Sequence, residues 1–407
     1  MKRRMEAAAL AAVGLLGVVT ALAQQGAIYG TVKLDSDREI TGVIRWEQEE
    51  AYWVHHFNGR HGKPRDISFL DDDDQEKILD QQPGPQLQLD DGTVIEFVKW
   101  FSSGELRPTD FAIEFGAIDR LELKGSWVDV TLRDGTEFEA YGGSNDIETE
   151  IFVKSEDGTE RELDWDEIDS IQFAETPAGH PQFVPQLYGR VKTRSGTLTG
   201  LVIWDNDERF ATDKLDGDLA TGEEVSIEFG EILSIISRGN SSVVVTRDGA
   251  ERELFNSNDV DADNRGIVVV NPAFGRALID WSVFEEVTYK QMPEDFLPAR
   301  SFWTVKPLSG TVETHDGKRL SGKLIYDVDE GSTAESLDGR AEGIDYDIPL
   351  RLVARVEPHE DGSSTVTLVD GTTLKMTGDR DVSSSNNGIL VDKAFLPWGE
   401  VKSISFE

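Results

Sequence analysis

The 407-residue sequence has no cysteine, so disulfide bonds and thiol catalysis are both excluded. Basic residues are also scarce, because 40 Lys and Arg stand against 78 Asp and Glu, which gives a formal net charge of −38. Such a surface repels nucleic-acid phosphates, whose binding requires clustered Lys and Arg. We therefore expect no nucleic-acid partner, and we expect cations or basic groups to be attracted.

Long apolar runs are missing after the N-terminus, so we expect no transmembrane segment in the mature chain. The N-terminus reads MKRRMEAAALAAVGLLGVVTALAQQ, in which three basic residues precede the apolar stretch 7–22. This pattern is typical of a secretory signal peptide over residues 1–23. A membrane anchor is the alternative, but the run is shorter than the ~20 residues of a spanning helix. We expect an exported protein of the periplasm, cell surface or extracellular space.

No window of helical length after the signal shows a clean 3.6-residue period. Instead, short segments alternate apolar and polar residues, as in Val243–Thr246 and Ser403–Phe406. Asp-Gly pairs such as Asp134-Gly135 follow several of these segments, and Asp-Gly tolerates the positive φ angles of tight hairpin turns. The sequence predicts an all-β fold with antiparallel strands.

One pattern occurs three times along the chain. Its first half reads IYGTVKLDSDREITGVIRWEQEEAYWVHHFNG from Ile28, LYGRVKTRSGTLTGLVIWDNDERFATDKLDG from Leu187 and LSGTVETHDGKRLSGKLIYDVDEGSTAESLDG from Leu308. The copies share G-x-V, a second Gly, an aromatic residue followed by an acid, and a closing Asn-Gly or Asp-Gly. The second halves also match, and each closes on an alternating strand, IDSIQF, FEEVTY or VKSISF.

These matches predict three tandem repeats, each of about eight short antiparallel strands in two small sheets or barrels. The repeats span 28–176, 187–290 and 308–407. Residues 60–109 of the first repeat have no counterpart and form an insertion. Function often lies where the symmetry of a repeat breaks, although an insertion is also tolerated on a surface without any function.

Each first half resembles the Sm-like and SH3-like small barrels through its G-x-V…G-x-(Leu/Val) pattern, as in Gly189–Val191 and Gly200–Val202. Sm proteins bind RNA, and the acidity of this chain argues against carrying that activity over. The whole chain resembles secreted bacterial β-repeat proteins that bear a similar N-D-V…N-R-G-I phrase. That resemblance implies a repeated β fold and no particular mechanism.

The segment SNDVDADNRGIVVV, residues 257–270, raises the question of a cation site. Asp259, Asp261 and Asp263 alternate as calcium ligands do, so Ca²⁺ is the one cofactor to consider. An EF-hand is excluded, because that loop requires Gly at its sixth position and Glu at its twelfth. Only the first Asp recurs in the other copies, which favours a turn in which its carboxylate accepts nearby backbone N–H groups.

Five tryptophans recur at equivalent places, and this recurrence favours core packing over a sugar-stacking surface. They are Trp46, Trp165, Trp204, Trp281 and Trp398. Trp53 and Trp100 lie outside this register, and with His55 and His61 they form a candidate binding surface near the insertion. A zinc site there is the alternative for the histidines, but adjacent His55 and His56 on one strand point to opposite faces.

The sequence contains no G-x-S-x-G elbow, H-E-x-x-H helix or phosphate loop, so no catalytic residue is assigned. We expect a non-catalytic exported binding or scaffold protein, with a protein, a glycan or a cation as its ligand. The alternative is a carbohydrate-active or metal-dependent hydrolase with a site near the insertion. A hydrolase predicts one deep pocket with converging polar groups, and a scaffold predicts equivalent surfaces on each repeat.

Overall fold

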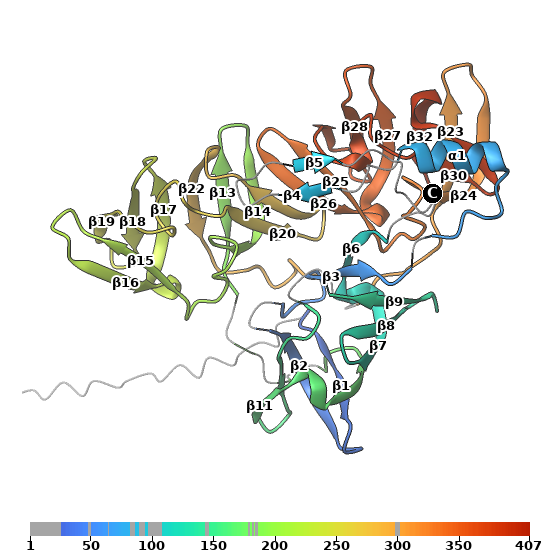
Figure 1. The fold of residues 1–407 in the computed structure, drawn as a ribbon. Helices are drawn as coiled ribbons and strands as arrows, with labels where there is room; N and C mark the ends of the chain where they lie inside the picture. The colour runs from blue at the N-terminus through green and yellow to red at the C-terminus, as the bar shows by residue number, and fades with distance from the viewer. Residues whose placement is uncertain are drawn as a thin grey trace, which may run out of the picture.

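A computed structural model gives the fold of the chain (Figure 1). It describes residues 26–47, 50–63, 65–81, 108–142, 146–177, 180, 183, 186–297 and 302–407, with the backbone of 86–88 and 94–96. The expected signal peptide and Trp100 lie outside these residues. The all-β prediction is confirmed, because strands make up most of the regular structure of the described residues, and these strands pair antiparallel. Within the described part of the chain, no helix has the length and apolar character needed to cross a membrane.

The strands form three large sheets. The first has the order β11 (Glu160–Leu163), β10 (Ile151–Lys154), β2 (Glu39–Trp46), β1 (Tyr29–Leu34), β12 (Ile168–Phe173), β7 (Ile118–Lys124), β8 (Trp127–Leu132), β9 (Glu137–Tyr141), β3 (His56–His61) and β6 (Asp110–Glu114). The second has the order β19 (Glu251–Leu254), β18 (Ser242–Thr246), β17 (Ile232–Ser237), β22 (Phe284–Tyr289), β13 (Tyr188–Thr193), β14 (Thr197–Ile203), β20 (Ile267–Asn271), β21 (Gly275–Ile279), β26 (Ile344–Pro349) and β25 (Ser336–Ala341). The third has the order β29 (Thr373–Met376), β28 (Ser364–Leu368), β27 (Val353–Pro358), β32 (Val401–Phe406), β23 (Ser309–Thr314), β24 (Arg319–Ile325), β30 (Ile389–Val391) and β31 (Ala394–Leu396).

The remaining elements are short. Two two-stranded sheets pair β15 (Lys214–Asp218) with β16 (Glu224–Glu228), and β4 (Gln86–Gln88) with β5 (Val94–Glu96). Single 3₁₀ turns precede or join strands at η2 (Phe115–Ala117), η3 (Trp165–Glu167), η4 (Phe229–Glu231), η5 (Leu350–Leu352), η6 (Arg380–Val382) and η7 (Trp398–Glu400).

Eight strands follow the same order in all three sheets. The order β9-β8-β7-β12-β1-β2-β10-β11 corresponds to β19-β18-β17-β22-β13-β14-β20-β21 and to β29-β28-β27-β32-β23-β24-β30-β31. A bulge also falls at the same point of β1, β13 and β23. We call the three parts the first lobe (residues 26–177), the second lobe (186–297) and the third lobe (302–407). In Figure 1 the second lobe is green to yellow and the third orange to red, and the two meet at β25 and β26.

Each lobe also contains a hairpin, formed by β3–β6, β15–β16 or β25–β26. Short turns join the hairpin strands in the second and third lobes. In the first lobe the insertion separates them, yet β3 and β6 still pair from His56 opposite Glu114 to Arg60 opposite Asp110. The insertion therefore replaces a hairpin turn. The third-lobe hairpin also joins the second sheet, because β21 pairs with β26.

The recurring glycines of the G-x-V…G pattern mark a close approach of backbones. Gly30 and Gly42 face each other on β1 and β2. A Cβ atom on Gly30 would lie 2.5 Å from the carbonyl oxygen of Gln172, and one on Gly42 would lie 2.2 Å from that of Lys154. Only glycine fits where neighbouring strands cross so tightly. The Asp-Gly turns also form as predicted, and Gly135, for example, has φ +85°.

Aromatic rings fill the centre of each lobe. The prediction that the recurring tryptophans are buried is confirmed, since their exposed fractions are 0–7% for Trp46, Trp165, Trp204, Trp281 and Trp398. Trp204 and Trp281 meet edge to face with ring centroids 5.9 Å apart. The sugar-stacking alternative for these five is wrong, because stacking requires an exposed ring face.

The described part of the insertion contains α1 (Asp72–Gln81), a helix that the apolar periodicity does not predict. The acidic run begins it, because Asp71 Oδ1 accepts a hydrogen bond from the N–H of Asp74 at 2.9 Å and acids in the first turn favour the helix dipole. Ile78 of the helix is fully buried and belongs to a cluster with Leu390 and Phe395 of the third lobe. The insertion thus connects the first lobe to the third.

A buried ion pair makes a second connection between these lobes. Arg351 donates hydrogen bonds to both carboxylate oxygens of Glu114 at 2.7–3.0 Å, and its guanidinium lies 4.4 Å from the ring centroid of Trp303. Glu114 is 2% exposed. Burial raises the pKa of Glu114, and the Arg351 charge opposes that shift. The carboxylate is therefore stable in its ionised form only beside the arginine.

We expect Trp281→Ala to lower the free energy of unfolding by about 3–5 kcal/mol, as deletion of a large core side chain does. The variant loses the ring contacts with Trp204 and Phe284 and the hydrogen bond from Nε1 to Gly239 O. Urea unfolding measures the change. The control is Trp127→Ala, at a ring that is 41% exposed, for which we expect about 1 kcal/mol or less. Equal losses in both variants would contradict the core assignment.

We expect Arg351→Met to cost about 3–5 kcal/mol of unfolding free energy, because it leaves the Glu114 carboxylate buried and unpaired. The double variant Arg351→Met/Glu114→Gln removes both charges and should recover most of that loss. Denaturant unfolding of the single and double variants gives the coupling between the two sites. If the double variant loses the sum of the unfolding free energies lost in the two single variants, the ion pair does not hold the lobes together.

Candidate functional site

A cavity of about 580 Å³ lies between the first-lobe hairpin and the third lobe. Asn58, His61 and Asp110 reach it from β3 and β6, beside the point where the insertion enters. The third lobe supplies the opposite wall from the segments 329–338 and 379–381. The cavity therefore forms beside the insertion that separates β3 from β6.

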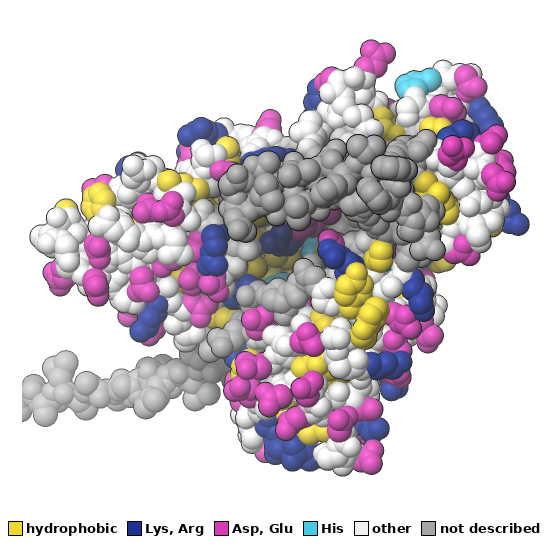
Figure 2. Space-filling model, in the orientation of Figure 1, with side chains coloured by type: hydrophobic (Ala, Val, Ile, Leu, Met, Phe, Trp, Pro, Cys, Tyr) yellow, Lys and Arg dark blue, Asp and Glu magenta, His cyan; other side chains and the backbone are white. Residues whose placement is uncertain are grey.

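Carboxylates dominate this acidic pocket. Eight of its seventeen lining residues are Asp or Glu, and they are Asp110, Asp329, Glu330, Glu335, Asp338, Asp347, Asp379 and Asp381. The cations nearby are already paired, since Arg60 bonds Asp110 at 2.7 Å and Arg276 bonds Asp347 at 2.9 Å. Acids elsewhere are scattered over the visible face of the molecule (Figure 2). The pocket concentrates a charge that the rest of the surface spreads out.

Behind the wall of the pocket lies a cluster of three acids, Asp327, Glu330 and Asp381, which we call the third-lobe cluster. Glu330 and Asp381 line the pocket, and Asp327 is fully buried behind them. One carboxylate oxygen of each lies within 4.8 Å of the others. Asp327 accepts hydrogen bonds from Arg380 Nε and from the backbone N–H of Asn387. Asp381 Oδ2 accepts the backbone N–H of Asp338 at 2.8 Å. Glu330 Oε2 is buried and has no hydrogen-bond partner.

Crowding of these acids disfavours their charged forms. Burial raises the pKa of Glu330 well above its usual range, and the neighbouring Asp329 carboxylate raises it further. Burial and the Asp327 carboxylate raise the pKa of Asp381 in the same way. The pKa of Asp327 rises to about 8, chiefly through burial. Positive charge in the pocket would oppose all three shifts.

Glu335 and His61 form the wall between the two lobes. The Glu335 Oε2 atom accepts backbone N–H groups of Gly331 and Ser332 at 2.6 and 2.8 Å, and its Oε1 lies 3.8 Å from His61 Nε2. Burial raises the pKa of Glu335 to about 7, although the nearby Arg65 opposes this. Burial lowers the pKa of His61 to about 4. Both side chains are thus held towards their neutral forms near pH 6.

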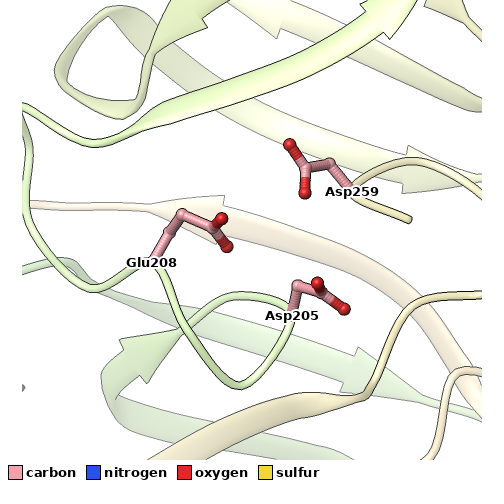
Figure 3. A group of neighbouring side chains, drawn as sticks. All are labelled: Asp205, Glu208 and Asp259. Carbon is pink, nitrogen blue, oxygen red and sulfur yellow. The ribbon is translucent and has the colours of Figure 1, made fainter. Parts of the chain in front are cut away.

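The second lobe has an equivalent cluster of Asp205, Glu208 and Asp259, the second-lobe cluster, again with oxygens within 4.8 Å of one another. Figure 3 shows Asp205 and Glu208 on one loop and Asp259 on a separate segment beside them. Arg265 pairs with Asp205 as Arg380 does with Asp327. Burial and Asp259 raise the pKa of Glu208 to about 8, and Glu208 Oε2 is buried without a partner.

The three alternating aspartates of the predicted calcium loop separate in space. Asp259 is 5% exposed and joins Asp205 and Glu208, whereas Asp263 is exposed and Asp261 only accepts the N–H of Asp263 at 3.0 Å. Neither Asp261 nor Asp263 belongs to an acidic cluster of the described residues. The cation candidate at this loop therefore involves Asp259 with acids from another part of the chain.

The local-turn explanation for the recurring aspartate is wrong. Asp259 Oδ2 accepts the backbone N–H of Asp216, 43 residues away, at 2.7 Å, and its backbone carbonyl accepts Trp204 Nε1 at 2.9 Å. Asp146 and Asp381 make equivalent bonds in the other lobes. This residue ties the hairpin of each lobe to the central aromatic ring. Gly266 has φ +104°, and strand β20 begins at the next residue, Ile267.

The predicted binding surface is wrong at two of its four residues. Trp53 is 1% exposed and packs against Phe302, and His55 is 4% exposed and accepts the N–H of Ala51 through Nδ1 at 3.1 Å. Both contribute to the interior because they precede β3 at the junction of the lobes. His61 does line the acidic pocket. Trp100 lies outside the described residues.

Glu208 and Glu330 are absent from the residues predicted to bind a ligand. A signal for them is present in the sequence, because each aromatic–acid pair is followed by Glu three residues after the acid. The three segments read WEQEE from Trp46, WDNDE from Trp204 and YDVDE from Tyr326. The backbone of this segment closes on itself, as in the bond from Trp204 N to Glu208 O at 2.7 Å. The closed loop places the glutamate carboxylate beside the acid of the aromatic–acid pair, as with Glu208 and Asp205.

Comparisons with known proteins give little help. No family model matches the sequence, and no curated protein matches it. Among solved structures, the chain titled "Streptogramin B lyase structure" has 10% sequence identity and a TM-score of 0.13, with 87% of this chain and 99% of that chain covered. A TM-score this low carries no argument about fold or function.

We expect Glu335→Gln to become more stable relative to the wild type as pH rises. Below pH 4.5 the carboxyl is protonated in both the folded and unfolded states, so its burial adds no pH dependence. Between pH 4.5 and about 7 only the unfolded state ionises, which destabilises the wild type by up to about 3 kcal/mol. Gln keeps an acceptor for the Gly331 and Ser332 N–H groups.

Urea unfolding at pH 4.5 and pH 8 measures this difference, with Glu223→Gln at an exposed position as the control. The control should show the same pH dependence as the wild type. If the difference in unfolding free energy between Glu335→Gln and the wild type is the same at pH 4.5 and pH 8, burial does not raise the pKa of this carboxyl.

Proposed function

We propose that the chain is an exported, non-catalytic binding protein built from three tandem β repeats, residues 28–176, 187–290 and 308–407. The common order of eight strands in three sheets, with bulges at equivalent points, supports the repeats. The basic and apolar N-terminal segment, residues 1–23, supports export to the periplasm, cell surface or extracellular space. We infer that its ligand is positively charged.

The acidic pocket carries this proposal. It has the volume of a ligand site and gathers eight acids around Arg380 and His61. Buried carboxylates without matching cations are costly, and a cationic ligand would offset that cost.

Calorimetry with spermidine as a cationic probe tests the proposal at 0.15 M NaCl, where exposed charges beyond about 8 Å are screened. The pocket variant Asp338→Asn/Asp379→Asn should bind at least tenfold more weakly than the wild type. Asn at 338 also imitates Asn58, its counterpart in the first lobe. The control Glu223→Gln/Glu224→Gln removes the same charge at exposed positions of β16 and its turn and should bind as the wild type does. Equal weakening in both would mean that only the net charge attracts the probe.

A metal-dependent or carbohydrate-active hydrolase is the second candidate, favoured by one observation. The pocket lies beside the insertion and holds Glu335, whose pKa is raised to about 7, as general acids often require. Against it, Glu335 is 8% exposed and its Oε2 already accepts two backbone N–H groups, so little of this carboxyl is accessible to a substrate. If the wild type hydrolyses chromogenic glycosides and Glu335→Gln does not, the protein is a hydrolase and the binding proposal is wrong.

A further inference from the structure

The third-lobe cluster has more negative charge than its surroundings balance. Arg380 is the one Arg or Lys among the described residues that line the pocket, and it pairs with Asp327 and Asp329. Glu330 and Asp381 therefore have no cation of their own. A buried pair of carboxylates in this position requires either protons or a bound cation.

The unpartnered carboxylate oxygen of Glu330 favours a bound cation. Glu330 Oε2 is buried, makes no hydrogen bond, and belongs to the carboxylate set whose oxygens lie within 4.8 Å of one another. Backbone and side-chain donors satisfy parts of Asp327 and Asp381, through Asn387 N and Asp338 N. Apart from the Asp329 carboxyl, with which Glu330 can share a proton, no donor reaches Glu330 Oε2. A bound cation would take the place of that proton.

We propose that the carboxylates of Asp327, Glu330 and Asp381 bind a divalent cation of the calcium class beside the acidic pocket, which Glu330 and Asp381 line. The ligands are all oxygen atoms, which suits a hard cation, and Ca²⁺ accepts an irregular set of carboxylates completed by water. The open side of the pocket provides the route of entry. This inference rests on the proposed function, because it names the ligand of the same pocket.

The second-lobe cluster repeats the arrangement, so a second cation binds there. Glu208 corresponds to Glu330, and its Oε2 is likewise buried without a partner. Each glutamate follows an aromatic–acid pair and closes the same backbone loop, with Trp204 N bonded to Glu208 O and Tyr326 N bonded to Glu330 O, both at 2.7 Å. The equivalence predicts two cations per chain.

The first lobe shows how the same position is filled without a metal. Its counterpart glutamate, Glu50, bonds Arg209 of the second lobe, with Oε1 and Nη1 3.2 Å apart. Arg209 is 3% exposed, so its charge acts within the interior. Asn58 replaces the aspartate of the other lobes and donates from Nδ2 to Asp146 Oδ2 at 2.8 Å. The Arg209 guanidinium thus supplies the positive group that Glu208 and Glu330 lack, and the Asn58 amide supplies a donor where the other lobes have an acid.

Calcium titration calorimetry of the full chain, after dialysis against EDTA, tests the inference. We expect two saturable events per chain with dissociation constants below 1 mM at 0.15 M NaCl. Glu330→Gln should remove one event and Glu208→Gln the other, whereas Glu224→Gln at an exposed position of β16 should remove neither. Melting temperatures with and without Ca²⁺ provide a second readout, because a ligand of the folded state stabilises it as the logarithm of its concentration over Kd.

The outcomes separate this inference from the proposed function. Saturable Ca²⁺ binding that persists unchanged in both Glu330→Gln and Glu208→Gln overturns the assignment of the ligands. Spermidine binding without any saturable Ca²⁺ event overturns the metal inference and leaves the proposed function standing. If the folded wild-type chain binds neither spermidine nor Ca²⁺, the proposed function and the metal inference are both wrong. Terbium luminescence excited through Tyr326, which adjoins the cluster, repeats the test for variants that are too unstable for calorimetry.

Discussion

A single set of hydrogen bonds to one aspartate holds each lobe together. A buried aromatic ring donates to the backbone carbonyl of that aspartate, as from Trp46 Nε1 to Asp146 O at 2.8 Å and from Tyr326 Oη to Asp381 O. The carboxylate of the same aspartate accepts a backbone N–H from the hairpin, for example that of Asn58 at 2.6 Å. Core, loop and hairpin therefore meet at one residue. The acidic clusters of the second and third lobes lie at this aspartate, which stays buried while its carboxyl oxygen accepts the hairpin N–H.

Much of the fold is predictable from the sequence because its determinants are local. Alternation of apolar and polar residues gives the strands, and Asp-Gly gives the turns, as at Gly135 with φ +85°. The recurring tryptophans lie in the core because a large ring in the same register of three copies is best accommodated inside. The one helix escapes prediction because its stability depends on capping by Asp71 and on packing of Ile78 against another lobe.

The candidate site is less predictable, because its parts come from distant segments. Alternating aspartates at 259, 261 and 263 suggest a local set of ligands, yet the structure joins Asp259 to a loop 50 residues earlier in the chain. The acidic pocket requires β3 and β6 to lie against the third lobe, and no spacing within one segment encodes that contact. His61 is the one member of the predicted surface that this packing brings to the pocket.

The pairing of β21 with β26 makes the second lobe dependent on chain that is synthesised after it. Four residues of β21, Arg276–Ile279, lie opposite Ile344–Asp347 of the third lobe. Before those residues emerge during synthesis, β21 is a bare edge strand whose N–H and C=O groups are open to pairing with another molecule. A hairpin borrowed from a neighbouring chain would satisfy the same groups, so the architecture carries a built-in route to domain-swapped oligomers. The second and third lobes are therefore not structurally independent units.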